Sequence, residues 1–182
     1  MDPVPLPAAP VPALPADSTL RPVSAADLAA ISELHAAAFG PGRFVRTAYR
    51  VREGSAPISA YCRVAVGPDG MILAALRFTP VSIGGKPGAL LLGPLAVRPT
   101  LANQGYGRAL IAAGLEAARA AGVDLVVLVG DMPYYARFGF SPVPPGRFRF
   151  PGPVNPARIL ACALRDGAVA EFAGLVAAVP QS

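Results

Sequence analysis

The chain has 182 residues, of which 53% are hydrophobic and 15% charged, against the roughly 25% of charged residues that is usual in soluble proteins. This composition fits one well-packed domain and excludes a chain that is disordered throughout. The formal net charge is +5 and every basic residue except Lys86 is an arginine, so nucleic acid, an anionic cofactor and a plain solvated surface all stay open as explanations.

Cysteine and histidine are scarce. Cys62 and Cys162 are the two cysteines and His35 is the one histidine, which excludes a disulfide framework and a clustered zinc site, so no metal is expected. Both cysteines alternate with apolar residues and are predicted to be reduced core residues of a cytoplasmic protein rather than nucleophiles. No signal peptide or membrane-spanning run is expected, because prolines interrupt the first 20 residues and the apolar runs are short.

Residues 1–18 carry a proline at every second or third position, which disfavours helix and removes ladder donors. We expect a disordered, proline-rich leader there and one folded domain over residues 19–182. A short strand is predicted at 19–23. A helix should then begin after Ser24, with Asp27 completing its cap, and end at Gly40; a second, short helix is predicted over residues 43–52.

The middle of the chain is predicted to form β-strands. Residues 58–66 alternate apolar and polar side chains, a turn is predicted at 67–70, and 71–79 should return as the second strand of a hairpin. The next predicted strand, 89–97, contains Gly93-Pro94. Since proline cannot donate within a ladder, we expect a bulge at that point.

A polar, glycine-containing loop at 103–107 leads into a predicted helix over 108–121, which is followed by an apolar strand at 123–129. The order strand, loop, helix, parallel strand indicates an α/β protein. A short helix from Pro133 and two late strands, at 140–143 and 158–164, complete the prediction. Residues 169–179 fit either helix or strand.

A glycine loop before a helix is suited to phosphate, because unpaired N–H groups and the positive end of the helix dipole point the same way. A Walker loop is excluded because its lysine is missing. The dinucleotide fingerprint is excluded because Leu110 stands where a third glycine should follow Gly105 and Gly107.

Residues 104–109 (Gln-Gly-Tyr-Gly-Arg-Ala) do have the form Gln/Arg-x-x-Gly-x-Gly/Ala. With Leu-Gly-Pro-Leu-Ala-Val-Arg-Pro upstream (92–99) and Tyr-Tyr-Ala-Arg-Phe-Gly-Phe downstream (134–140), this segment resembles the GNAT superfamily of acetyl-coenzyme A dependent N-acetyltransferases. The additional Val-Gly-Asp at 129–131 is similar to its YhbS-like branch.

The resemblance implies the α/β GNAT fold, a mixed sheet of about six to seven strands that splays between strands 4 and 5 and is flanked by about four helices. It also implies acetyl-CoA as cosubstrate, with the pantetheine arm in the splay and the pyrophosphate on backbone amides. Glycine at 105 and 107 would let the backbone approach phosphate closely, and Arg98 and Arg108 would add charge. The implied cofactor-binding residues are Leu95, Ala96, Val97, Gln104, Gly105, Tyr106, Gly107, Arg108 and Ala109.

The implied reaction is acetyl transfer to a primary amine of a small molecule or peptide. Tyr135 matches the family's general acid, with an aromatic packing role as the alternative; Tyr134 is expected to pack. Many relatives carry a glutamate on the fourth strand, but 89–97 has no carboxylate. Asp131 is therefore the candidate base, with a role as helix N-cap as the alternative. His35 could also serve as the base, although a single histidine on an apolar helix face is expected to pack in the core. Deprotonation through water, or an acceptor amine with a low pKa, would need no base.

The missing strand carboxylate leaves a second hypothesis, a GNAT-like module that binds acyl-CoA as a sensor or partner without efficient turnover. The acceptor pocket is expected to be formed by residues 39–52 and by the segment after Phe140. We expect no nucleic acid or membrane partner, and either a monomer or a homodimer.

Overall fold

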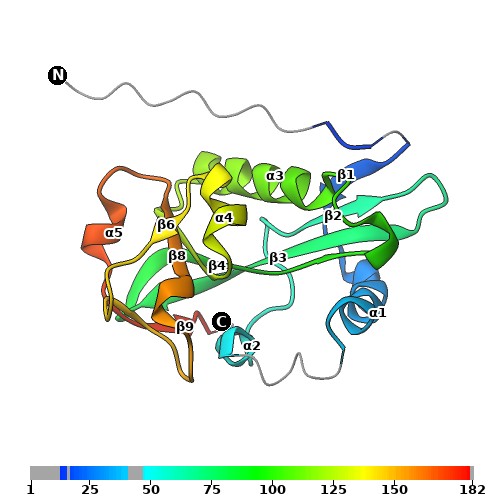
Figure 1. The fold of residues 1–182 in the computed structure, drawn as a ribbon. Helices are drawn as coiled ribbons and strands as arrows, with labels where there is room; N and C mark the ends of the chain where they lie inside the picture. The colour runs from blue at the N-terminus through cyan, green and yellow to red at the C-terminus, as the bar shows by residue number, and fades with distance from the viewer. Residues whose placement is uncertain (1–12, 16, 41–46, 181–182) are drawn as a thin grey trace.

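The computed structural model describes residues 13–15, 17–40 and 47–180, which contain both helices and strands (Figure 1). The α-helices in these residues are α1 (Leu28–Phe39), α2 (Thr47–Arg52), α3 (Tyr106–Ala120), α4 (Met132–Tyr135) and α5 (Ala168–Glu171). The strands are β1 (Thr19–Pro22), β2 (Arg63–Val66), β3 (Ile72–Ile83), β4 (Lys86–Val97), β5 (Leu125–Val129), β6 (Ser141–Pro142), β7 (Phe148–Arg149), β8 (Ile159–Ala163) and β9 (Gly174–Ala178). No helix in the described ranges is both long and apolar enough to cross a bilayer.

The strands form one mixed sheet in the order β1-β2-β3-β4-β5-β8-β6, with β9 pairing β3 and β7 off this path. Neighbours along the path are antiparallel except β4 and β5, which are parallel because α3 provides the crossover between them. The described residues contain nine strands rather than the six or seven predicted. The additional pair is β7, which has two residues, and β9, which with α5 accounts for the ambiguous segment 169–179.

Both faces of the sheet are covered, and alternation along the central strands divides the core in two. Val126 and Leu128 of β5 point into the cluster beneath α3, whereas the intervening Leu125 and Val127 point into a second cluster that includes Val51 of α2. This explains why β5 is apolar at every position and does not alternate in its sequence. In Figure 1, α3 lies over one face of the sheet and α1 and α2 lie on the other side.

The predicted start of the first helix is confirmed. Ser24 and Asp27 form a reciprocal capping box ahead of α1, and the Asp27 carboxylate also accepts hydrogen bonds from Arg21 at 2.7 and 2.8 Å. Residues 1–12 and 16 of the predicted leader lie outside the described residues. Leu14, however, packs against the core cluster beneath α3, so at least one leader residue contacts the fold.

One predicted strand is too long. Only Arg63–Val66 of segment 58–66 pairs with β3, and the preceding residues turn away. The Ser59 hydroxyl donates to the carbonyl of Phe78 at 2.6 Å, and Arg77 donates to the carbonyl of Ala56 at 2.9 Å. Hydrogen bonds from side chains thus replace part of the backbone hydrogen bonds expected between residues 58–62 and β3. The alternation of apolar and polar residues in the sequence does not show this difference.

Candidate active site

The centre of the sheet opens at the predicted bulge. β4 pairs with β5 only from Ala89 to Leu91, and beyond that point the two strands separate. On its other edge, β4 shifts register against β3, so that Gly93 and Pro94 are both accommodated opposite Arg77. The bulge and the splay between strands 4 and 5 are therefore confirmed.

The backbone of β4 beyond the bulge presents amides to this opening. Arg98 N–H donates to the carbonyl of Leu73 at 2.9 Å, which directs the Arg98 amide toward β3. Because successive amides of a strand point to opposite edges, the Ala96 amide also faces β3, whereas those of Leu95 and Val97 face the splay. Ala96 pairs with Ala75 and its side chain is buried, so of the three residues predicted to contact the cofactor, Leu95 and Val97 are the two whose amides face the splay. The cofactor contact itself stays a prediction.

The loop before α3 supplies a second group of amides. Within the described residues, the N–H groups of residues 104–108 have no hydrogen-bond acceptor, while Ala109 N–H donates to the carbonyl of Gly105 at 3.1 Å. Of the six amides predicted to contact the pyrophosphate, those of residues 104–108 are therefore available to a ligand and that of Ala109 is engaged within the loop and helix. The pyrophosphate contact itself stays a prediction. Gly105 has φ +93°, a conformation that favours glycine, and the Tyr106 side chain is buried in the core, so Tyr106 presents only its backbone.

Gly107 has a packing role beside the cofactor role predicted for it, which stays a prediction. A Cβ on this buried residue would lie 2.7 Å from the Tyr134 hydroxyl and 3.3 Å from a methyl group of Leu95. The missing side chain therefore makes room for α4 and β4 against the first turn of α3. At Gly105, in contrast, a Cβ would meet nothing within 4 Å, so this glycine is the one selected by backbone conformation.

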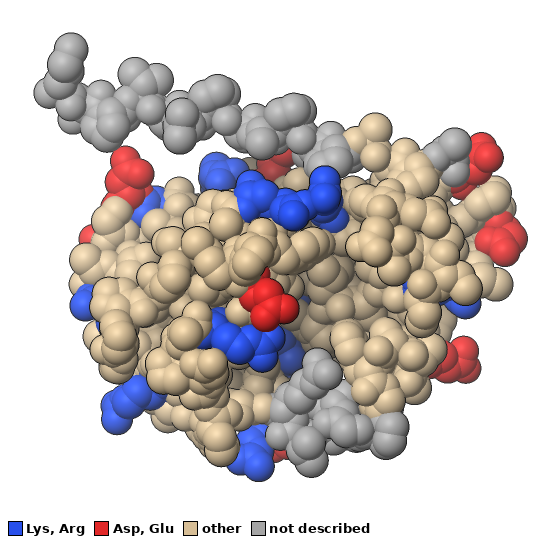
Figure 2. All heavy atoms as spheres, viewed as in Figure 1, with Lys and Arg blue, Asp and Glu red and all other residues tan. Residues whose placement is uncertain are grey.

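Basic side chains lie near the start of α3, and Figure 2 shows a group of Lys and Arg side chains in the upper middle of the view. Arg108 is exposed, and Arg98 is half-buried with its Nε donating to the carbonyl of Ile72 at 3.0 Å. Arg137 lies over the ring of Tyr134, 5.2 Å from its centroid. Burial raises the pKa of the Tyr134 hydroxyl, and Arg137 and Arg108 partly oppose that rise.

The sequence also groups arginines at positions 43, 46, 50 and 52 and at positions 147 and 149, and the described members of each group lie in different surroundings. Arg147 of the second group donates to the carbonyls of Val169 and Ala170, so it ties the segment before β7 to α5, while Arg149 is exposed. In the first group, residues 41–46 lie outside the described residues. Of its remaining members, Arg52 is buried and Arg50 is exposed.

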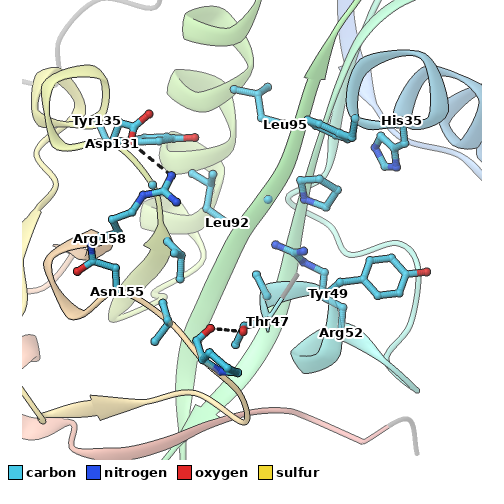
Figure 3. A pocket seen from close by; sticks show the side chains of 18 residues that line it. His35, Thr47, Tyr49, Arg52, Leu92, Leu95, Asp131, Tyr135, Asn155 and Arg158 are labelled. Atoms are coloured by element: carbon cyan, nitrogen blue, oxygen red, sulfur yellow. Dashed lines mark hydrogen bonds and ion pairs between the residues drawn. The ribbon is translucent and has the colours of Figure 1, made fainter. Parts of the chain in front are cut away.

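A cavity of about 620 Å³ adjoins the splay (Figure 3). Its walls come from α1, α2, the β4 bulge, the end of β5, α4 and residues 153–158, so it lies between the two segments predicted to form the acceptor pocket. That this cavity takes the acceptor stays a prediction. The Thr47 hydroxyl donates to the carbonyl of Pro153 and so joins α2 to the opposite wall. The described side chains that bring polar groups to the lining are His35, Thr47, Tyr49, Arg52, Asp131, Tyr135, Asn155 and Arg158.

Tyr135 lines this cavity and Tyr134 does not. The two rings meet edge to face with centroids 4.9 Å apart, and the Tyr135 ring lies so close to Gly130 that a Cβ there would approach it to 2.6 Å. Burial, with smaller contributions from Tyr134 and Asp131, raises the pKa of Tyr135 to about 12. The hydroxyl therefore stays protonated at neutral pH, as a proton donor must.

Asp131 lies at the mouth of the cavity with 77% of its side chain exposed and forms an ion pair with Arg158 at 3.3 Å. It occupies the N-cap position of α4, but its carboxylate makes no capping hydrogen bond. Asp131 is thus the N-cap residue of α4 by position, but its side chain does not cap the helix. His35, predicted to pack in the core, instead lines the cavity from α1 and contacts Phe39.

Both cysteines are buried and reduced, as predicted. Burial raises the pKa of the Cys162 thiol, which disfavours the nucleophilic thiolate. Sequence reasoning did not single out Asn155 or Arg158, and it grouped Arg52 with the neighbouring arginines 43, 46 and 50 without a role of its own.

Comparison with known proteins fits this geometry. Residues 19–143 match the acetyltransferase (GNAT) domain family. The uncharacterised N-acetyltransferases YhbS and YjhQ of Escherichia coli K12 are 34% and 35% identical over 79 and 77 residues, which are 43% and 41% of this chain. The matched segments span less than half of these two relatives, 47% and 42% of their lengths.

Two solved structures resemble the whole fold. The crystal structure of YhbS from Escherichia coli in complex with CoA superposes with a TM-score of 0.75 at 28% identity, covering 92% of each chain. A GNAT family acetyltransferase from Brucella melitensis in complex with acetyl-CoA gives a TM-score of 0.60 at 31% identity, covering 83% of this chain and 97% of that one. On the family match and the shared fold, the chain belongs to the GNAT acetyltransferase family.

Proposed function

We propose that the protein is an acetyl-CoA dependent N-acetyltransferase that acetylates a primary amine of a small molecule or peptide. One observation carries the proposal: the β4–β5 splay connects two sets of free backbone amides to a cavity into which a protonated tyrosine projects. The CoA and acetyl-CoA complexes of the two structural relatives support the choice of cosubstrate.

The residues present fit acetyl-CoA. Five amides at the N-terminus of α3, with Arg98 and Arg108 beside them, suit a pyrophosphate, since amides and helix dipole both favour an anion there. The Leu95 and Val97 amides suit the amide-containing pantetheine arm, which needs hydrogen-bonding partners along its length. When bound, acetyl-CoA supplies a thioester as acetyl donor.

The chain's own groups then have distinct tasks. The Leu95 amide is placed to stabilise negative charge on the reacting carbonyl oxygen, an effect of about 3–4 kcal/mol for one such donor. The Tyr135 hydroxyl donates its proton to the departing thiolate as the carbon–nitrogen bond forms and the carbon–sulfur bond breaks. Asp131, exposed at the cavity mouth, accepts the proton that the amine loses, directly or through water.

A second function is favoured by one feature of the site. β4 contains no carboxylate, and Asp131 is the one acid among the described residues that line the cavity. A protein without an efficient base would bind acyl-CoA as a sensor or partner module and turn it over slowly.

One pair of measurements tests the proposal. Acetyl-CoA binding is followed by calorimetry, and CoA thiol release is followed over a panel of amines with a no-protein control. We expect binding together with amine-dependent release and an N-acetylated product by mass spectrometry. Binding without release for any amine would support the sensor module, and no binding at all would contradict both functions.

A further inference from the structure

Arg52 is the most unusual charged group in the described residues. Arg52 is the last residue of α2 and is only 8% exposed to solvent. Its Nε is buried and has no hydrogen-bond partner among the described residues. No guanidinium nitrogen of Arg52 bonds to a carboxylate among the described residues, and the undescribed segment 41–46 contains no Asp or Glu. A buried cation without a counter-ion is costly, so a site that keeps one is organised to receive an anion.

The immediate surroundings increase the need for an anion. Arg77, half-buried opposite the β4 bulge, is close enough to repel Arg52, and its own hydrogen bonds go to the Ser55 hydroxyl and the Ala56 carbonyl, both neutral. Burial first, and Arg77 second, lower the pKa of Arg52 to about 9. At neutral pH the guanidinium therefore remains charged.

The guanidinium is directed into the cavity at the bulge. Its Nη2 lies 2.8 Å from where a Cβ on Gly93 would stand, and Arg52 lines the 620 Å³ cavity (Figure 3). Glycine at 93 is thus what lets the guanidinium reach the backbone beside the splay. The acid in the same lining, Asp131, already pairs with Arg158, so the anion for Arg52 has to come from a ligand.

We propose that Arg52 binds a carboxylate on the acceptor, which makes the protein selective for small amino carboxylates over neutral amines. The proposal rests on the proposed function and specifies its acceptor. The planar fork of a guanidinium matches a carboxylate with two parallel hydrogen bonds. Because Arg52 sits at the bulge, where the reacting carbonyl would lie, the amine and the carboxylate must be only a few bonds apart.

The binding test needs no turnover. Glycine, β-alanine, γ-aminobutyrate and larger α-amino acids are each compared with the corresponding carboxamide in thermal-shift measurements on wild type, Arg52→Gln and Arg149→Gln. Arg149 is exposed on β7 outside the cavity lining, so its variant controls for lost charge. We expect at least one carboxylate to stabilise wild type and Arg149→Gln but not Arg52→Gln. Stabilisation of Arg52→Gln to the same extent, or no response to any carboxylate, would overturn the assignment.

The kinetic test separates this role from a role at the reacting carbonyl. In wild type, kcat/KM for the preferred carboxylate should exceed that for its carboxamide by at least tenfold, and Arg52→Gln should remove the difference by raising KM. An equal loss of kcat for both acceptors would place Arg52 at the reacting carbonyl and overturn the proposal. If no acceptor is acetylated but the thermal shift depends on Arg52, the proposed function fails while the carboxylate site stands.

Discussion

The Tyr134 hydroxyl lies over the first turn of α3, 2.7 Å from where a Cβ on Gly107 would stand. This contact ties the N-terminal end of α3, the proposed phosphate site, to α4, the helix that carries Tyr135. The same glycine that the sequence motif assigns to the cofactor is therefore also a packing residue between two parts of the site.

Gly107→Ala should lower stability. Replacing glycine by alanine inside a helix stabilises it by up to about 1 kcal/mol. The added Cβ would, however, crowd Tyr134 and Leu95, which should destabilise the protein by about 1–3 kcal/mol. Tyr134→Phe removes the crowded hydroxyl, so the double variant should recover much of the loss, a coupling of about 1 kcal/mol in urea unfolding. Strictly additive effects of the two substitutions would show that this contact does not limit residue 107.

Gly105→Ala should affect binding more than folding. A Cβ at this position would meet no atom within 4 Å. The backbone φ of +93°, however, costs alanine about 1–2 kcal/mol of conformational energy. The loop should therefore change conformation, and its amides should move. We expect the Kd for CoA to rise roughly tenfold by calorimetry. An unchanged Kd in a folded Gly105→Ala protein would exclude this loop as the phosphate site.

The two ends of α3 offer a matched test of electrostatics. Arg108 lies exposed in the first turn and Arg119 exposed in the last. Arg108→Gln should weaken CoA binding by roughly 3- to 10-fold and reduce its dependence on salt, as expected for a charge-assisted contact with phosphate. Arg119→Gln should leave Kd unchanged, and equal losses in both variants would indicate a general charge effect.

The parts of this site that could be predicted from the sequence are those determined by residues close together in the chain. Gly105 and its neighbours determine the loop and the start of α3 within a few residues, so the sequence pattern predicted a glycine loop followed by a helix. The packing of Tyr134 on Gly107 joins segments 27 positions apart, and alternation at 58–66 could not show that Ser59 and Arg77 replace the ladder. The burial of Arg52 likewise results from the packing of α2 against the β4 bulge, which the arginine-rich sequence around α2 does not show.

Asp27 should make stability depend on pH. Hydrogen bonds from Arg21 and Ser24 hold the pKa of this buried carboxyl far below its ordinary value near 4. Its contribution is therefore present above pH 4 and is lost as pH falls below that value. Asp27→Asn should cost about 1–2 kcal/mol of unfolding free energy at pH 7 and much less near pH 3. The exposed Asp166→Asn is the control; a pH-independent cost for Asp27→Asn would contradict the assignment.

The raised pKa of Tyr135 predicts the alkaline limb of the rate profile. The active form is the protonated hydroxyl, which persists up to its pKa of about 12 and is lost above it. With a neutral amine as acceptor, whose binding does not use Arg52, the acetyl-transfer kcat/KM, corrected for uncatalysed thioester hydrolysis, should therefore not decline between pH 8 and about 10.5, where an unperturbed tyrosine would titrate. A descending limb near pH 10 would mean that the acid is less buried than this structure has it.

The adjacent tyrosines provide the most direct test of the central claim, that Tyr135 protonates the leaving thiolate in acetyl transfer. The measurement is kcat for amine-dependent CoA release by wild type, Tyr135→Phe and Tyr134→Phe, with acetyl-CoA affinity determined for each. We predict that Tyr135→Phe lowers kcat by about 10² to 10⁴ without weakening binding, while Tyr134→Phe stays within a few fold of wild type. Similar kcat values for Tyr135→Phe and wild type would contradict the account.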